Sequence, residues 1–410
     1  MSSVANAGAK VASPQVYGEI PAIPTQELGG GFRFDFNHGC RVKLPDDGKE
    51  YRVVFKDSDS ELIVFANDVA PGSLVVSAKK FFVRWRIEVY PKGGTELLYS
   101  HEYDATGKRV VVQIPGGTLG DGIAWFSYVE RFQQRHQFRL TCAIAPRLAE
   151  ILSRQYPEIE FITADQVKSL PNLYACYYLG LFFKGDVDNQ PVDFRYAGLH
   201  RTAGRILGLG DLSDQPPRVD LSTPRRIKEK YVCIAVQSSS QAKYWNNPWG
   251  WDKLIAYLKR HGYRVLCIDR ERVHGAGLIW NHIPQGAEDF TGELPLQERI
   301  DLIKDAEFFI GLSSGLSWLA WCCKVPVVMI SGFTEAENEF YTPYRVINYH
   351  GCHGCWNDTR ENFDHFDYLW CPRHKGTERQ FECTRLITPE QVIATVKCLV
   401  EPEEATANAG

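Results

Sequence analysis

Apolar and polar residues follow different patterns in successive parts of the chain. Between residues 31 and 115 they alternate or form short apolar runs that are rich in aromatic and β-branched side chains. Turn sequences such as Pro45-Asp46-Asp47-Gly48 separate these runs. The spacing predicts short strands in a small all-β barrel or sandwich. No catalytic constellation is visible in this part of the sequence.

From Val110 onward, apolar strand-like runs alternate with helical patterns. A strand that ends at Pro115 leads through a glycine-rich turn into a predicted helix at 123–136, and a further helix is predicted from Phe194 to Leu207. Residues 208–230 are rich in Pro, Asp, Ser and Arg, which indicates a linker. A second series of strands and helices begins at Tyr231. The order predicts an α/β fold with two Rossmann-like lobes.

These patterns predict six segments along the chain. They are a flexible tail (1–28), an N-terminal β-rich domain (29–109), a first Rossmann-like half (110–222), a second Rossmann-like half (223–345), a four-cysteine metal finger (346–386), and a C-terminal helix with a tail (387–410). In the last segment, Thr388 is the expected N-cap and Pro389 the first helical residue.

Composition narrows the function classes. A hydrophobic content of 44%, a charged content of 23% and a net charge of −4 describe a globular chain with no tendency to bind nucleic acid. No apolar run approaches the roughly 18 residues of a membrane span. The first residues lack the pattern of a secretory signal. Twelve cysteines in such a chain indicate a reducing, cytoplasmic compartment, where clustered cysteines are more often metal ligands than disulfides.

Two turns in the second α/β half have the residues to bind a phosphate group. Gly311-Leu312-Ser313-Ser314-Gly315 joins a strand to a helix, so backbone N–H groups and two hydroxyls meet at the positive end of a helix dipole. Lys243 and neighbouring serines follow the strand that starts at Tyr231. The alternatives are an ordinary turn with serine caps and a solvated surface lysine. Neither turn has a P-loop pattern or a complete G-x-G-x-x-G pattern.

The glycine-rich turn of the first half contains a carboxylate. Asp121 follows Gly116-Gly117-Thr118-Leu119-Gly120 at the end of a strand. It could serve as a general base or orient a ligand. A helix-capping role is the equally simple alternative.

Four cysteines near the C-terminus have the spacing of a metal site. Cys352, Cys355, Cys371 and Cys383 follow the pattern C-x2-C-x15-C-x11-C. Four thiolates suit Zn²⁺ or a single iron ion, and a closed site of this kind indicates a structural role. Four unrelated thiols are the alternative. The nearby histidines, second choices as ligands, are His350, His353, His365 and His374. The other cysteines mostly lie in apolar runs and are expected in the core.

Three motifs together resemble one family, the bacterial autotransporter heptosyltransferases. They are GGTLGDGIAW at 116–125, QSSSQAKYWNNPWGW at 237–251, and GLSSGLSWLAW at 311–321 followed by the four cysteines. The resemblance extends over about residues 110 to 400. It implies a GT-B fold with an acceptor half and a donor half, ADP-heptose as donor, and serine hydroxyls of an adhesin passenger as acceptor. It also implies an iron ion in the finger, a cytoplasmic bacterial enzyme and a ring of twelve subunits.

The same resemblance assigns roles to individual residues. Asp121, beside Gly120, matches the catalytic aspartate, and Lys243 matches a lysine that binds the donor phosphate. The diphosphate turn corresponds to Ser314, Gly315 and Leu316. Ser313 and Trp318 replace an aspartate and a histidine of the related lipopolysaccharide enzymes. An inverting single displacement is implied, and since no Asp-x-Asp motif stands in the right place, we expect no requirement for Mg²⁺.

Two alternative functions remain open from the sequence. The same fold could use another nucleotide sugar, because sugar choice depends on side-chain geometry around the crevice. A non-enzymatic metalloprotein could use an iron or zinc centre for electron transfer or docking. That second alternative leaves the two phosphate turns without a purpose.

Overall fold

A computed structural model describes residues 16–183 and 186–401, so most of the predicted terminal tails lies outside the described residues. The chain divides into two compact units. The N-terminal unit comprises Pro14–Gly117 and Ala124–Gln215, and the C-terminal unit comprises Thr118–Ile123 and the chain from Pro216 onward. The segment Thr118–Ile123, which includes the first turn of one helix, therefore belongs to the C-terminal unit.

The N-terminal unit contains a mixed sheet of eight strands in the order β11-β10-β9-β12-β2-β3-β6, with β1 paired to β2. Their bounds are β1 Gln26–Gly29, β2 Phe32–Asn37, β3 Arg41–Lys43, β6 Leu74–Val76, β9 Arg109–Gln113, β10 Arg139–Ala143, β11 Glu160–Ile162 and β12 Leu173–Tyr178. The strand β12 pairs in parallel with β2, through Ala175 and Phe36. Strands from the β-rich beginning of the chain thus extend the sheet of the first α/β half.

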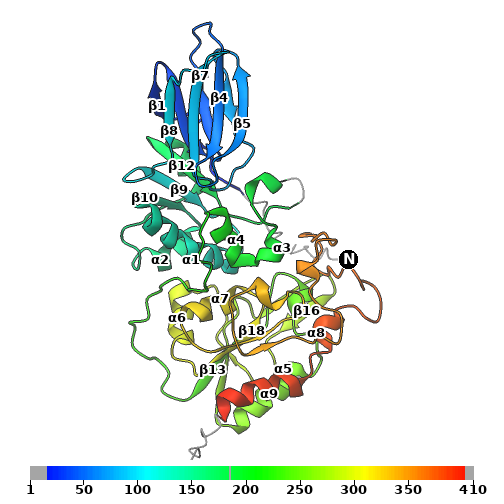
Figure 1. Ribbon diagram of the computed structural model, residues 1–410. Helices are drawn as coiled ribbons and strands as arrows, with labels where there is room; N and C mark the ends of the chain where they lie inside the picture. The colour runs from blue at the N-terminus through cyan, green and yellow to red at the C-terminus, as the bar shows by residue number, and fades with distance from the viewer. Residues whose placement is uncertain (1–15, 184–185, 402–410) are drawn as a thin grey trace, which may run out of the picture. The chain divides into compact units, whose positions relative to one another are not determined.

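Four further strands of the N-terminal unit form an antiparallel sheet in the order β5-β4-β7-β8. They are β4 Tyr51–Asp57, β5 Leu62–Val69, β7 Trp85–Pro91 and β8 Tyr99–Glu102, and they are blue in Figure 1. The predicted strands are therefore present, and they divide between two sheets that meet through aromatic contacts such as Phe32 of β2 with Tyr51 of β4, whose ring centroids are 4.8 Å apart. Alternation predicts a half-buried strand but does not determine its neighbours.

The helices of the N-terminal unit differ from the predicted ones at two ends. They are α1 Leu119–His136, α2 Pro146–Leu152, α3 Phe194–Ala197 and α4 Leu199–Ile206, with short 3₁₀ turns η1 Ala164–Ser169 and η2 Val187–Asn189. Helix α1 starts four residues earlier than the predicted 123, so Asp121 lies inside its first turn. The predicted helix from Phe194 to Leu207 is split at Gly198, whose φ of 87° is outside the helical region.

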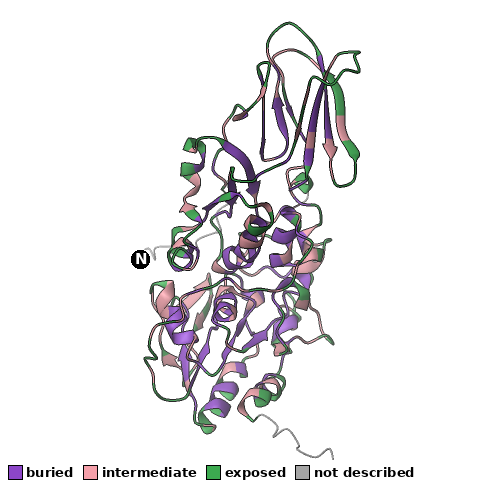
Figure 2. Ribbon diagram, turned by 60° about the vertical axis from the view of Figure 1, so that its left-hand side comes forward, coloured by how far each residue is buried: buried purple, intermediate pink, exposed green. Residues whose placement is uncertain are grey.

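The C-terminal unit is built on a parallel sheet of six strands in the order β17-β14-β13-β18-β19-β20. They are β13 Tyr231–Ile234, β14 Arg264–Cys267, β17 Glu288–Asp289, β18 Phe309–Leu312, β19 Val327–Ile330 and β20 Arg345–Val346. Every residue of the three central strands β13, β18 and β19 is buried (Figure 2). A strand that is covered on both faces needs a continuous apolar run, which explains their sequences.

Helices and short segments complete the C-terminal unit. They are α5 Gly250–Arg260, α6 Leu296–Ile303, α7 Gly315–Cys322, α8 Glu382–Arg385, α9 Pro389–Val400, the hairpin β15 Val273–Ala276 with β16 Ile279–His282, and the 3₁₀ turns η3 Gln241–Lys243, η4 Ala336–Asn338 and η5 Cys355–Asn357. The helices α5 and α9 lie side by side (Figure 1) and share one apolar core with the sheet.

Local signals fix the C-terminal helix as the sequence predicts. The Thr388 hydroxyl accepts a hydrogen bond from the Gln391 N–H, and the side-chain oxygen of Gln391 accepts one from the Thr388 N–H. Pro389 occupies the first helical position. This capping box confirms the predicted helix start. Within the described chain, no helix combines the length and the apolar composition that a membrane crossing needs.

Candidate functional site

The turn between β18 and α7 has the geometry of a helix-terminal anion site. The buried strand β18 ends at Leu312, and Ser314 takes an extended conformation (φ −150°, ψ 170°) as the N-cap of α7. The Ser314 side chain makes no capping hydrogen bond to the helix. The first N–H groups of any helix have no partner inside that helix, and the dipole there is positive. Ser314, Gly315 and Leu316 are therefore presented as the sequence predicts, with ligand binding itself still a prediction.

Two glycines allow the first turn of α1 to approach the start of α7. A Cβ atom on Gly315 would lie 2.8 Å from the Leu119 Cβ and 3.1 Å from the Gly120 nitrogen. A Cβ atom on Gly120 would lie 2.8 Å from the Trp318 Cδ1 and 3.3 Å from the Gly315 Cα. Side chains larger than hydrogen would force these segments apart. Gly120 and Gly315 thus have a packing reason to be glycine, whatever they also contact.

Asp121 has a capping role and an unusual electrostatic environment. Its carboxylate accepts a hydrogen bond from the Thr118 N–H at 3.2 Å, and its own N–H donates to the Thr118 hydroxyl at 3.3 Å. Burial raises the pKa of Asp121 above its ordinary value, while Thr118, Lys243 and His365 oppose that rise. A carboxylate with a raised pKa is a stronger base. The capping and base roles are therefore compatible.

Lys243 lies at the end of η3, after the strand β13. Its ammonium group is 5.5 Å from the centre of the Phe333 ring, within the range of a cation–π contact. Burial lowers the pKa of Lys243, and the charges of Asp121 and Glu339 oppose this decrease. The structure thus brings Lys243 into electrostatic range of Asp121, two residues that are 122 positions apart in the sequence.

His365, a second-choice metal ligand in the sequence, is instead in electrostatic range of this pair. Burial lowers the pKa of His365 most, Lys243 lowers it further, and Asp121 and Asp364 raise it. Ring packing against Phe363, with centroids 4.6 Å apart, orients the imidazole. No sequence signal indicates this position, because His365 comes from the loop between the second and third cysteines.

Ser313 is buried beneath the turn and does not face outward with Ser314. Its hydroxyl donates to the carboxylate of Glu339, and it lies 3.2 Å from the Thr334 hydroxyl. Glu339 in turn forms an ion pair with Arg345 at 2.9 Å. No role for Glu339 or Arg345 is visible in the sequence, since neither charged residue belongs to a motif.

The four predicted metal ligands are drawn into one region. Cys355 and Cys371 belong to a small apolar core with Phe333, Trp370 and Phe381, and Cys352 packs against it. Burial raises the pKa of Cys355 most, and the neighbouring thiols Cys352, Cys383 and Cys371 raise it further. Burial first, and then the neighbouring thiols Cys352 and Cys371, raise the pKa of Cys383 to about 12.

Four thiols gathered in one region have the donor chemistry of a thiolate site. However, among residues 16–183 and 186–401, no group of three or more His, Cys, Asp or Glu side chains has an arrangement that could hold a metal ion. The four-cysteine finger therefore stays a prediction. Of the cysteines expected in the core, Cys398 is exposed, so that part of the expectation is wrong.

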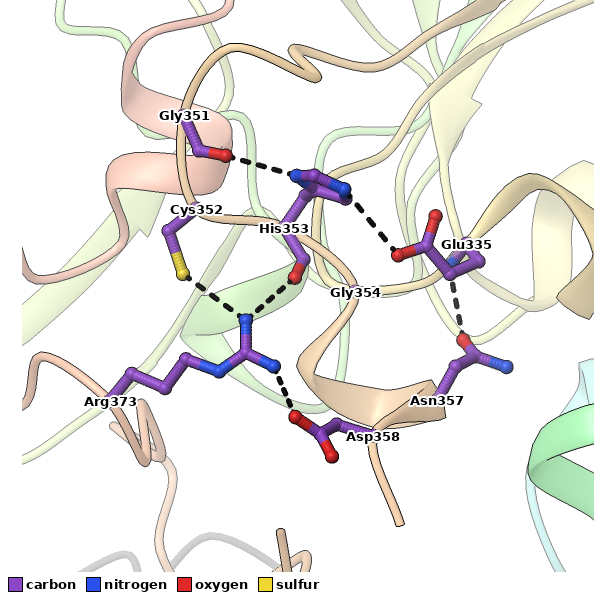
Figure 3. A pocket seen from close by; sticks show the side chains of 8 residues that line it. All are labelled: Glu335, Gly351, Cys352, His353, Gly354, Asn357, Asp358 and Arg373. Carbon is purple, nitrogen blue, oxygen red and sulfur yellow. Dashed lines mark hydrogen bonds and ion pairs between the residues drawn. The ribbon is translucent and has the colours of Figure 1, made fainter. Parts of the chain in front are cut away.

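A cavity of about 330 Å³ lies beside Cys352 (Figure 3). Arg373 donates to the His353 carbonyl at 3.0 Å and to the Cys352 sulfur at 3.8 Å, and it pairs with Asp358. The His353 ring bonds to the Gly351 carbonyl at 3.0 Å and is 3.7 Å from Glu335. His353 Nδ1 thus has a hydrogen-bond partner, and the role of His353 as an alternative metal ligand stays a prediction.

Comparisons with known proteins identify the family of this chain. Residues 29–93 match the N-terminal domain of glycosyltransferase TibC, and residues 209–360 match glycosyltransferase family 9, the heptosyltransferases. The autotransporter heptosyltransferase Aah of Escherichia coli is 53% identical over 380 residues, which are 92% of this chain and 96% of Aah. The autotransporter heptosyltransferase TibC of Escherichia coli O78:H11 is 55% identical over 379 residues, 92% of each chain.

Solved structures of TibC are similar over nearly the whole chain. The crystal structure of the iron-containing dodecameric glycosyltransferase TibC from enterotoxigenic E. coli H10407 has a TM-score of 0.89 and 54% identity, and covers 93% of this chain and 98% of that one. TibC in complex with ADP-D-beta-D-heptose has the same TM-score and coverage at 53% identity. The fold and its relatives define this chain as a glycosyltransferase. It belongs to the autotransporter heptosyltransferase family and is a heptosyltransferase, which sets aside the non-enzymatic alternative.

The close approach of the two helix starts leads to a stability prediction. Gly315→Ala should lower the free energy of unfolding by about 1–3 kcal/mol, because its Cβ would collide with Leu119. Gly116→Ala is the matched control, since a Cβ there meets no atom within 4 Å. Urea unfolding of both variants measures the difference. Equal stability of the two variants would contradict the packing role of Gly315.

Proposed function

We propose that this heptosyltransferase moves heptose from ADP-heptose to serine hydroxyls of an autotransporter adhesin, with Asp121 as the general base. The observation that carries the proposal is the grouping, in one unit, of a carboxylate with a raised pKa, a cation and a helix N-terminus. A base, a charge that balances the leaving group and an anion site are what such a transfer needs. The complex of the relative TibC with ADP-D-beta-D-heptose supports the donor.

The proposed reaction is a single displacement with inversion. Asp121 accepts the proton of the serine hydroxyl as its oxygen forms a bond to the anomeric carbon, and the bond from that carbon to the ADP oxygen breaks. The departing diphosphate gains negative charge, which Lys243 and the N–H groups of Gly315 and Leu316 stabilise. The Ser314 hydroxyl, not used in capping, can donate to the same oxygens.

We further propose that Cys352, Cys355, Cys371 and Cys383 hold one structural iron ion and that the chain assembles into dodecamers. The relative TibC, described as iron-containing and dodecameric, supports both parts. The ion would tie the segment after β20 to the small apolar core around Phe333. Since Phe333 also contacts Lys243, loss of the ion should disturb the position of that lysine.

The first experiment tests the reaction and its base together. Asp121→Asn should lower heptose transfer by about 10²–10⁴-fold and leave ADP binding unchanged, because asparagine keeps an oxygen that accepts from Thr118 but cannot take a proton. Intact mass spectrometry of an adhesin passenger, co-expressed in a host that makes ADP-heptose, measures transfer. Calorimetry with the purified enzyme measures ADP binding.

The matched control for Asp121 is Asp252→Asn, an exposed aspartate in the first turn of α5. Heptose masses on the passenger with the wild type and this control, and their near-absence with Asp121→Asn, would support the proposal. Normal transfer by Asp121→Asn would remove Asp121 from the role of base. Binding of UDP in preference to ADP by the wild type would favour another nucleotide sugar.

The electrostatic contact between Asp121 and Lys243 predicts a shift in pH dependence. Lys243 lowers the pKa of Asp121, so Lys243→Met should raise that pKa. Because the base must be deprotonated, the acidic limb of kcat/KM should move to higher pH, in addition to any loss of donor affinity. Lys253→Met, on the exposed face of α5, is the control and should leave the limb in place. If the acidic limb of kcat/KM in Lys243→Met stays in place or moves to lower pH, the electrostatic interaction between Lys243 and Asp121 is refuted.

Metal content tests the proposed iron site. Elemental analysis of the purified wild type should find about one iron ion per chain, the stoichiometry of a four-thiolate site. Cys383→Ser should lose most of it and unfold at lower temperature, whereas Cys398→Ser, at an exposed cysteine, should keep it. If the wild type contains zinc and no iron, the proposed identity of the bound ion is wrong. Full iron content in Cys383→Ser would refute the ligand set.

A further inference from the structure

A buried carboxylate lies directly beneath the predicted phosphate turn. Glu339 is 2% exposed and follows η4. Its carboxylate accepts hydrogen bonds from the Ser313 hydroxyl, from the Asn338 side-chain amide at 3.0 Å and from the Arg345 guanidinium at 2.9 Å. The Thr334 hydroxyl is 3.4 Å away. Both oxygens of Glu339 therefore have partners.

The network around Glu339 connects three neighbouring strands of the C-terminal sheet. Ser313 follows β18, Thr334 lies in the segment after β19, and Arg345 begins β20. Arg345 also donates to the hydroxyl of Ser331, the residue directly after β19, at 3.1 Å. The side chain of Arg345 is only 8% exposed. Burial of an ion pair costs free energy that the attraction between the charges does not fully recover. Such a pair is better explained by a role in position than by stability.

The hydrogen-bond partners of Ser313 leave its hydroxyl without a proton for the donor phosphate, which the sequence predicts it to bind. Its hydroxyl proton is directed to Glu339, and one lone pair faces the Thr334 hydroxyl at 3.2 Å. The residue is 6% exposed. A hydroxyl that has one proton cannot also donate it to a phosphate oxygen. Contacts to an anion at this turn therefore fall to Ser314 and to the N–H groups of Gly315 and Leu316.

We propose that Glu339 is a positioning residue of the donor site, which holds the turn before α7 through its hydrogen bond with Ser313. The inference rests on the proposed function, because it assumes that Lys243 and this turn bind the donor diphosphate. The groups that act on Lys243 are Asp121 and Glu339, both carboxylates, and Lys243 in turn affects His365. Since burial lowers the pKa of Lys243, loss of one carboxylate would favour the neutral amine at lower pH.

The test compares two glutamates of one segment in the full-length enzyme. Glu339→Gln keeps the size of the side chain but loses its charge, so the Kd for ADP should rise about fivefold or more near neutral pH. The alkaline limb of ADP binding, measured by calorimetry between about pH 6 and about pH 10, should move to lower pH. Glu337→Gln, at an exposed position two residues earlier, should leave the Kd for ADP and the alkaline limb of ADP binding unchanged. A purely structural role would lower the active fraction without moving the limb.

A second variant separates the turn from the charge and covers the case in which Glu339→Gln does not fold. Ser313→Ala keeps the Glu339–Arg345 ion pair, so it should raise the Kd for ADP and the KM for the donor about threefold, with kcat and the alkaline limb nearly unchanged. Wild-type affinity and an unchanged limb in folded Glu339→Gln would overturn the proposal. Wild-type affinity in Ser313→Ala, if Glu339→Gln does not fold, would also overturn it.

Measurements of ADP binding and heptose transfer by the wild type distinguish an error in the proposed reaction from an error in the proposed role of Glu339. A wild type that binds ADP but transfers no heptose would refute the proposed reaction, and the two variants would still decide the role of Glu339. A wild type that binds neither ADP nor UDP would refute the donor site and with it the role of Glu339.

Discussion

The burial of charged groups within the C-terminal unit is the constraint on which the candidate site depends. Burial disfavours every charged form, so it raises the pKa of Asp121 and lowers the pKa of Lys243. Each charge partly offsets the shift of the other. A lone buried charge would neutralise instead, whereas a carboxylate, an ammonium and a second carboxylate can stay ionised together. Glu339 and Arg345 extend this balance beneath the turn.

Packing of glycines sets the geometry in which these charges meet. The first turn of α1 can approach the start of α7 because Gly120 and Gly315 have no Cβ atoms. Asp121 is fixed at that point by its reciprocal hydrogen bonds with Thr118. A capping interaction therefore orients the same carboxylate that we propose as the base. The capping role of Asp121 and its proposed role as base are therefore served by the same position of the carboxylate.

Most elements of the fold could be predicted from local sequence, because their signals are local. The buried strands β13, β18 and β19 are continuous apolar runs, and α9 carries its own capping box and an N-terminal proline. Boundaries and partners were less predictable. Helix α1 begins before the glycine-rich segment ends, and Gly198 divides a predicted helix in two. The β-rich beginning supplies strands to two sheets, since alternation specifies a face but not a neighbour.

The sequence by itself determined the α/β character, the turn at Ser313-Ser314-Gly315 and the motifs that place the chain in its family, because each is written in consecutive residues. Only the tertiary structure decided that Asp121 and Lys243 act on each other, that His365 lies within electrostatic range of them, and that the Ser313 hydroxyl is directed to Glu339. These contacts join residues separated by 26 positions or more. Local pattern carries no information about such pairs, since folding of the whole sheet is what brings its strand ends and loops together.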